Sequence, residues 1–398
     1  MTVFNHGFTT MTDSIVITAA RRTAIGAFQG QFSPVSSPEL GAAAIRAVIE
    51  DSGIDGNDVS EVLMGCVLPA GTGQAPARQA SIGAGLPLSA GATTLNKVCG
   101  SGMKAVMLGH DAIRAGSADV VVAGGMESMT NAPYLVKRGL RMGHDQLIDH
   151  MFFDGLQNPY DGQMMGGFGE KCAAKYNFSR EQQDDFSRAS VERANKAIEE
   201  GLFSGEIVPV KVKSRKGDME IATDEEPGRI NVDKIPNLRP AFAKDGTITA
   251  ASSSKISDGA AALVLMSADN ASRRGIQPLA RIVAHATHSQ EPEWFTTAPV
   301  GAMKKVLERA GWRADEVDLY EINEAFATVT MAAMHEHGLP HDKVNIHGGA
   351  CALGHPIGCS GARILVTLIH ALKATGGKRG VASLCIGGGE ATAVAIEL

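Results

Sequence analysis

The chain has 398 residues, of which 44% are hydrophobic and 20% are charged, as is typical of a globular protein with a large core. This composition excludes a disordered chain and a collagen, and no apolar run approaches the ~18–20 residues of a membrane helix. The net charge of −6 argues against a nucleic-acid partner. The 46 glycines and only 5% aromatic residues predict close backbone packing.

Six cysteines are spread along the sequence without any CxxC pair. This spacing predicts neither a disulfide framework nor a zinc site, and reduced thiols favour a cytoplasmic protein. Residues 1–13 are polar and lack the pattern of a signal peptide, and Met11 offers a second possible start.

Short apolar runs alternate with helical patterns from the N-terminus onward. Residues 15–17 predict a buried strand, and residues 38–52 predict a helix that ends at Gly53. Continuous apolar runs of this kind are typical of a mainly parallel sheet that is covered by helices on both faces. Further strands are predicted at 120–123, 261–266 and 381–386.

The same order of elements occurs twice along the chain. In each copy a helix ends at a glycine, Gly53 or Gly311, and a valine follows six positions later. Next come a glycine-rich loop, a second helix and an apolar strand that ends in glycines, over residues 96–125 and 345–389. Three matches in the same order predict two similar α/β halves.

The segment 132–254 fits neither half. It is richer in charge, proline and methionine, and it holds one clear helix, which Ser179 and Gln182 cap and Gly201 ends. An insertion of this size commonly carries a lid or binding loops. We therefore expect an N-terminal half from residues 11–131 and 255–278, a loop domain at 132–254 that covers the site and binds the ligand, and a C-terminal half at 279–398.

Two cysteines lie where strands and helices meet. Cys99 precedes a helix within a glycine-rich run, so backbone N–H groups and the helix dipole would favour its thiolate. Cys385 ends an apolar strand before three glycines, whose N–H groups could hold an oxyanion. Taken alone, Cys99 more often represents a small buried side chain, and Cys385 fits a core cysteine equally well.

A histidine and an asparagine occupy similar junctions. His355 lies in a glycine-rich loop that leads to a helix, where it could serve as the base for a nearby thiol or be structural. Asn323 follows a short apolar run, and taken alone such a residue is most often a helix N-cap. All four junction residues together are a stronger indication of catalysis than any one of them.

Four sequence blocks around these residues resemble those of the thiolase family, in family order and across nearly the whole chain. They are NKVCGSG at 96–102, NEAF at 323–326, GHPIG at 354–358 and CIGGG at 385–389. The resemblance implies an α/β protein with a thiolase-like five-layer α-β-α-β-α fold, built from two repeated halves with an inserted loop domain. It also implies that coenzyme A thioesters are the substrates, that no cofactor or metal takes part, and that the chain forms a homo-oligomer, a dimer or tetramer.

The resemblance also assigns roles to the four blocks. Cys99 would carry the acyl group, and His355 would take its proton. Cys385 would remove the α-proton of a second acetyl-CoA, whose enolate oxygen His355 and a water on Asn323 would hold. The N–H groups of Cys99 and Gly387 would hold the first oxyanion.

Further residues match the family's coenzyme A site, and three positions depart from many of its biosynthetic members. Ser254, one of the matching residues, taken alone is equally a turn residue. The departures are Met164 for His, Ser252 for Asn and Phe295 for Met, and Met164 and Phe295 would border the acyl end. The matching residues are Phe242, Ala250, Ser253, Ser254, Ile256, Ala325 and Phe326.

The activity that this resemblance favours is the reversible condensation of two acetyl-CoA molecules to acetoacetyl-CoA. Bulky Met164 and Phe295 would fill the acyl end and favour short chains. The alternatives are a degradative 3-ketoacyl-CoA thiolase for longer chains, a ketoacyl synthase, which has no need for Cys385, and a non-catalytic protein that binds coenzyme A or lipid.

Overall fold

The computed structural model describes residues 14–139, 141–213 and 217–398, so the polar start of the chain with Met11 lies outside the described part. Its strands are β1 Ile15–Thr23, β2 Gly26–Ala27, β3 Glu61–Gly65, β4 Gly91–Leu95, β5 Val120–Ser128, β6 Tyr134–Leu135, β7 Ile148–Asp149, β8 Ile207–Val208, β9 Val210–Val212, β10 Met219–Ile221, β11 Ser257–Ser267, β12 Ala280–Ser289, β13 Leu319–Ile322, β14 Arg379–Ile386 and β15 Glu390–Glu397. Its α-helices are α1 Ser37–Ser52, α2 Pro76–Gly83, α3 Ser101–Arg114, α4 Met165–Tyr176, α5 Arg180–Glu199, α6 Ala268–Arg273, α7 Ala298–Ala310, α8 Ala327–His337, α9 Ala350–Leu353 and α10 Ser360–Thr375.

One hydrogen-bonded path of strands runs through both halves, in the order β13-β14-β15-β12-β1-β11-β5-β3-β4. The two halves meet where β1 pairs with β12 over three residues, Ile15 to Ile17. Strand β11 follows the insertion in sequence and returns to lie between β1 and β5. The predicted strands at 15–17, 120–123, 261–266 and 381–386 are confirmed as β1, β5, β11 and β14.

The prediction of a mainly parallel sheet is wrong. Strand β11 runs antiparallel to both β1 and β5, and β15 runs antiparallel to β12 and β14. Only the outer pairs β3–β4, β3–β5 and β13–β14, together with the short β1–β8 contact, are parallel. Helices cover both faces of these strands, so they are apolar throughout whatever their direction.

Five layers of structure stack in the molecule. Helices α1 and α2 cover the N-terminal strands, and α7 with α8 covers the C-terminal ones, while α3 and α10 pack together between them. Glycines permit this central contact. A Cβ on Gly102 would come within 3.0 Å of the Gly358 carbonyl oxygen, and one on Gly361 within 2.5 Å of the Met103 nitrogen. The N-terminal ends of α3 and α10, which follow the cysteine and histidine blocks, therefore touch.

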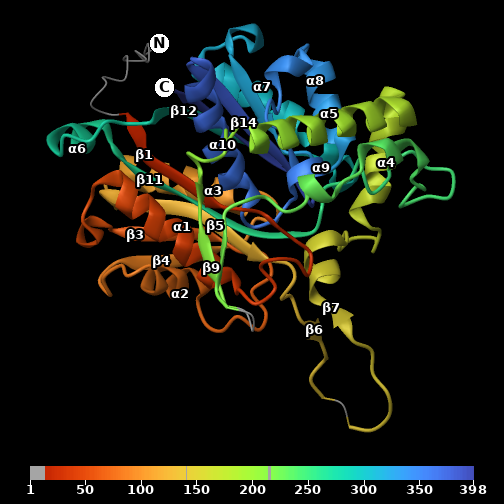
Figure 1. Cartoon of the computed structure of the whole chain (residues 1–398), viewed down its shortest axis with the longest axis horizontal. Coiled ribbons are helices and arrows are strands. Elements are labelled where there is room, and N and C mark those ends of the chain that lie inside the picture. Colours follow the sequence, from red (N-terminus) through yellow and green to blue (C-terminus); the bar gives the residue numbers. More distant parts are fainter. Residues whose placement is uncertain (1–13, 140, 214–216) are drawn as a thin grey trace, which may run out of the picture.

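The insertion contains more structure than the sequence predicts. Helix α5 has the expected capping box of Ser179 and Gln182. Helix α4 was not predicted, because its glycines at 166, 167 and 169 have low helix propensity. A long arm that carries β6 and β7 projects from the body (Figure 1). Among the described residues, no helix is both long and apolar enough to cross a membrane.

Candidate active site

Cys99 lies on a tight turn between β4 and α3. The preceding residue, Val98, has a positive φ of 46°, which a β-branched residue rarely adopts. The turn is held by Asn96 Oδ1, which accepts from the Val98 N–H at 2.9 Å, and by Ser101. The Ser101 hydroxyl accepts from the Lys97 N–H at 2.8 Å and donates to the Val98 carbonyl at 2.7 Å. Such strained backbone is typical of functional sites.

The surroundings of Cys99 keep its thiol protonated at neutral pH. Burial raises the pKa of Cys99 to about 11, and hydrogen bonds from the backbone N–H groups of Gly387 and of Cys99 itself oppose this rise. The side chain packs against an apolar cluster that includes Met129 and Ile357. A base must therefore take the proton before the sulfur can attack.

His355 is a buried, neutral imidazole with a defined tautomer. Its Nδ1 lies 2.6 Å from the Ser360 hydroxyl oxygen, which lies 3.0 Å from the Pro356 carbonyl oxygen. Because Ser360 donates its one hydrogen to that carbonyl, it accepts from Nδ1–H, which leaves the lone pair on Nε2. Burial, helped by the positive charge of Arg363, lowers the pKa of His355 to about 3. Nε2 is therefore unprotonated at neutral pH, with its lone pair free.

Asn323 faces His355. Its Nδ2 lies 3.4 Å from His355 Nε2, and its backbone N–H donates to the Ser383 carbonyl on β14 at 3.0 Å. Asn323 Oδ1 is buried and has no hydrogen-bond partner within the described structure, so it can accept from a water or a ligand. The N-cap interpretation is wrong, because α8 begins at Ala327 after an extended Phe326.

Cys385 lies near the end of β14 and is fully buried. Burial raises the pKa of its thiol well above the usual value, and negative charge on Cys99 raises it further, so the two sulfur atoms lie close enough to interact. Gly387 follows directly after the strand, and a Cβ there would lie 3.6 Å from Val98 Cγ1. Strand β14 thus brings both Cys385 and the Gly387 N–H to Cys99.

An apolar cavity of about 230 Å³ reaches His355. Six of the residues that the sequence predicts for substrate binding line it, namely Met164, Phe242, Ser253, Ser254, Ile256 and Phe326. The remainder of its wall comes from residues that the sequence argument missed: Met129, Phe152, Leu156, Met165, Gly166, Lys255 and Ile357. An apolar cavity with a histidine in its lining suits an acyl thioester.

Three predicted binding residues lie outside the lining of this cavity. Ala250 is exposed, and Ala325 supports the wall by accepting a hydrogen bond from the Ser254 N–H at 3.0 Å. Phe295 packs in the buried cluster that also holds Cys385, with its ring edge-on to Phe168. Of the departures from the family pattern, Ser252 is buried and accepts from the Thr249 N–H at 2.9 Å.

Lys255 and Glu127 hold the loops of the site from behind. The Lys255 carbonyl accepts from the His355 N–H at 3.0 Å, and its ammonium donates to the Ser253 carbonyl at 3.1 Å. The buried Glu127 carboxylate accepts from the Gly358 N–H at 2.9 Å and from two further backbone N–H groups, while burial raises its pKa to about 7. Position next to Ser254 is the only sequence signal for Lys255.

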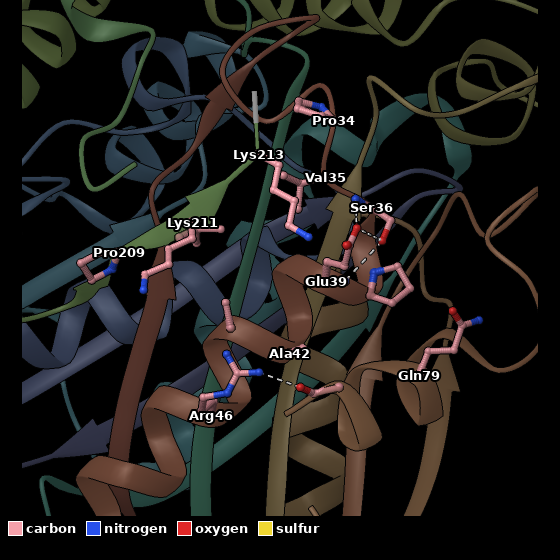
Figure 2. A pocket seen from close by; sticks show the side chains of 14 residues that line it. Pro34, Val35, Ser36, Glu39, Ala42, Arg46, Gln79, Pro209, Lys211 and Lys213 are labelled. Atoms are coloured by element: carbon pink, nitrogen blue, oxygen red, sulfur yellow. Dashed lines mark hydrogen bonds between the residues drawn. The ribbon is translucent and has the colours of Figure 1, made fainter. Parts of the chain in front are cut away.

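Of two other hollows, one shares Met165 with this cavity and one lies apart from it. One, of about 440 Å³, is lined by Val98, Met165 and Gly387 together with residues between 153 and 162, and therefore adjoins the Cys99 turn. Another, of about 790 Å³, lies between α1 and the β9 segment, with Arg46, Lys211 and Lys213 around it (Figure 2). None of the four sequence blocks contributes to that larger hollow.

The chain matches known proteins over nearly its whole length. Residues 15–269 match the family model "Thiolase, N-terminal domain", and residues 276–398 match "Thiolase, C-terminal domain". An acetyl-CoA acetyltransferase of Pseudomonas aeruginosa is 49% identical over 96% of this chain and 98% of its own length. One of Chromobacterium violaceum is 50% identical over 96% and 99%.

Solved structures show the same fold. The crystal structure of a Bacillus anthracis acetyl-CoA acetyltransferase is 40% identical and matches with a TM-score of 0.94, over 96% of this chain and 98% of that one. A thiolase of Ascaris suum in complex with coenzyme A is 43% identical and matches with a TM-score of 0.92, over 96% and 99%. The chain belongs to the thiolase family.

Proposed function

We propose that the protein is an acetyl-CoA C-acetyltransferase, which condenses two acetyl-CoA molecules to acetoacetyl-CoA and coenzyme A in a reversible reaction. The observation that carries this proposal is the position of Cys99, which has Cys385 and the Gly387 N–H near it and packs against Ile357 in the wall of the apolar cavity that His355 lines. The acetyl-CoA acetyltransferases that are 49% and 50% identical to this chain support the acetyl substrate.

In the first half-reaction, Cys99 accepts the acetyl group. His355 Nε2 takes the Cys99 proton, the sulfur bonds to the thioester carbonyl carbon, and the N–H groups of Cys99 and Gly387 hold the oxyanion. The carbon–sulfur bond to coenzyme A then breaks, and the leaving thiolate takes the proton of Cys385. Acetyl-Cys99, a protonated His355 and a Cys385 thiolate remain.

In the second half-reaction, the Cys385 thiolate takes an α-proton from another acetyl-CoA. The enolate oxygen accepts a hydrogen bond from protonated His355 and from a water that Asn323 Oδ1 binds, and this role suits the unpartnered oxygen atom. The enolate carbon bonds to the acetyl carbon, the bond to Cys99 breaks, and the Cys99 sulfur recovers its proton from His355. Each thiol and the imidazole return to their starting states.

Thiolysis and a chain-length series test this proposal. We expect acetoacetyl-CoA and coenzyme A to give acetyl-CoA, with kcat/KM at least ~10-fold above that for 3-ketoacyl-CoA of six carbons or more. Met164 at the cavity wall supports the short-chain preference. The 440 Å³ hollow beside Gly387 favours the degradative alternative, so a kcat/KM that climbs with chain length would assign the protein to longer substrates.

We also propose that the chain forms a homo-oligomer in the cytoplasm. Strand β4 ends the sheet with one open edge, and the arm exposes Tyr134, Val136, Met142 and Leu147. The six cysteines are unpaired, as expected in a reducing compartment. Sedimentation of the purified chain should give a mass at least twice that of the 41.6 kDa protomer.

A further inference from the structure

A cluster of two histidines and an aspartate lies where the two halves meet, well away from Cys99. His110 and Asp111 are near the C-terminal end of α3, and His285 is in the middle of β12. Among the described residues, this is the one group of three or more His, Cys, Asp or Glu side chains whose ligand atoms lie within 4.8 Å of one another. The catalytic mechanism uses none of them.

The three ligand atoms converge on one point. His285 Nε2 lies 3.3 Å from His110 Nδ1 and 2.9 Å from Asp111 Oδ1, and His110 Nδ1 lies 3.0 Å from the same oxygen. Around a tetrahedral ion with bonds of ~2.0–2.1 Å, ligand atoms are roughly 3.3 Å apart. An ion therefore fits after shifts of a few tenths of an ångström.

The donor set and its exposure suit an exchangeable transition metal. Two imidazoles and a carboxylate bind Zn²⁺, Co²⁺ or Ni²⁺ rather than Mg²⁺ or Ca²⁺. The histidine side chains are 18% and 16% exposed, whereas that of Asp111 is 51% exposed, so the ion can enter from solvent and keep water ligands there. The positive charge of Arg114 acts on His110 and weakens the binding.

Without an ion, the cluster has a hydrogen-bonded alternative. Asp111 Oδ1 can accept from both imidazole N–H groups, since both lie within 3.0 Å. In that state the two ring nitrogens, 3.3 Å apart, face each other as two donors. A bound ion would remove this contact between two N–H donors, because each ring nitrogen would then coordinate the ion through its lone pair.

We propose that His110, Asp111 and His285 form an open three-ligand site for a divalent transition-metal ion, which links the end of α3 to β12. Helix α3 begins two residues after Cys99 and has 14 residues, and a helix rises by roughly 1.5 Å per residue. Most of the length of α3 therefore lies between the metal site and the nucleophile. The expected role is therefore to stabilise the joint between the halves and not to take part in the reaction.

Metal titration of the untagged full-length protein, stripped with a chelator, tests the site. Calorimetry with Zn²⁺ and absorption spectra with Co²⁺ should show one ion per chain. The melting temperature should rise by about 3 °C at an ion concentration of 100 Kd. Thiolysis with acetoacetyl-CoA should change less than about twofold when the ion is removed, so this test is independent of the proposed function.

Variants separate the cluster from other metal-binding groups. His110→Ala and His285→Ala should each weaken metal binding at least ~10-fold. Asp111→Asn, which keeps the shape of the side chain, should weaken it as much and serves as the test if either alanine variant fails to fold. His288→Ala is the matched control, because His288 lies on the same strand and its ring contacts Gln290 at 3.0 Å. Unchanged binding in His285→Ala and Asp111→Asn, a sulfur-ligated Co²⁺ spectrum, or no stoichiometric binding would each overturn the proposal.

Discussion

Helices α3 and α10 begin with the same two residues, serine and glycine, and use them differently. Ser101 opens α3, and its hydroxyl holds the backbone on both sides of the Val98 turn, next to Cys99. Ser360 opens α10, and its hydroxyl instead holds the side chain of His355 in one tautomer. The repeat thus places equivalent serines at both helix starts, and one positions a main chain while the other positions an imidazole.

The largest effect should come from removing one of the two thiols, Cys99 before α3 or Cys385 on β14. Cys99→Ala should abolish acyl-enzyme formation and turnover in both directions, because no other group carries the acetyl. Cys385→Ala should still accept one acetyl group on Cys99 but lose at least ~10²-fold in condensation. Intact-mass analysis after acetyl-CoA treatment and a condensation assay measure both. Acetylated Cys99→Ala, or a Cys385→Ala enzyme that condenses normally, contradicts the assignment.

The pH dependence of alkylation should show that the Cys99 proton stays on sulfur until a base takes it. With a Cys99 pKa of about 11, the thiolate fraction rises about tenfold per pH unit between pH 7 and 9 and does not level off. The rate of iodoacetamide labelling at Cys99, followed by peptide mass analysis, measures this. The fully buried Cys359 serves as the internal control. A plateau below pH 9 would mean that the thiol is already activated in the free enzyme.

The two serines themselves sharpen the comparison. Ser360→Ala removes the acceptor for His355 Nδ1–H, so we expect kcat/KM to fall about tenfold, as for the loss of one buried hydrogen bond of ~1–3 kcal/mol. Its pH profile should also change, because the imidazole tautomer is no longer fixed. Ser101→Ala leaves His355 intact and should act mainly on the free energy of unfolding. Equal activity losses with unchanged pH profiles would show that both serines are structural only.

The smallest effect on turnover should come from the glycines that follow the serines. Gly361→Ala places a Cβ 2.5 Å from the Met103 backbone nitrogen, so we expect a loss of ~1–3 kcal/mol in the free energy of unfolding. Gly167→Ala, on α4, is the matched control, because the added Cβ would have its nearest neighbour, Gln163 Oε1, 3.7 Å away, and alanine favours a helix. Urea unfolding of both variants measures the difference. A stable Gly361→Ala would show that α3 and α10 can separate without cost.

The sequence predicted the repeat and the four chemical blocks, because each is a local pattern around Cys99, Asn323, His355 or Cys385. It failed where a role depends on distant contacts. Without the family resemblance, Asn323 looks like an N-cap, but its side chain faces His355. Ser360 and Lys255 matter because they bond to His355, which sequence spacing does not reveal. Strand direction was also hidden, because β11 reaches β1 and β5 only after the insertion.

The position of β1 constrains the order in which the chain can fold. Its main partners are residues 261–267 on one side and 280–282 on the other, and only Arg22 and Thr23 pair earlier, with residues 207–208, so most of β1 waits for some 250 residues before it can pair. Contacts of such long sequence separation slow folding, because loop-closure entropy is lost before the strand is stabilised. During synthesis β1 is therefore an apolar, unpaired segment, and a chain truncated before residue 261 should need a chaperone or aggregate.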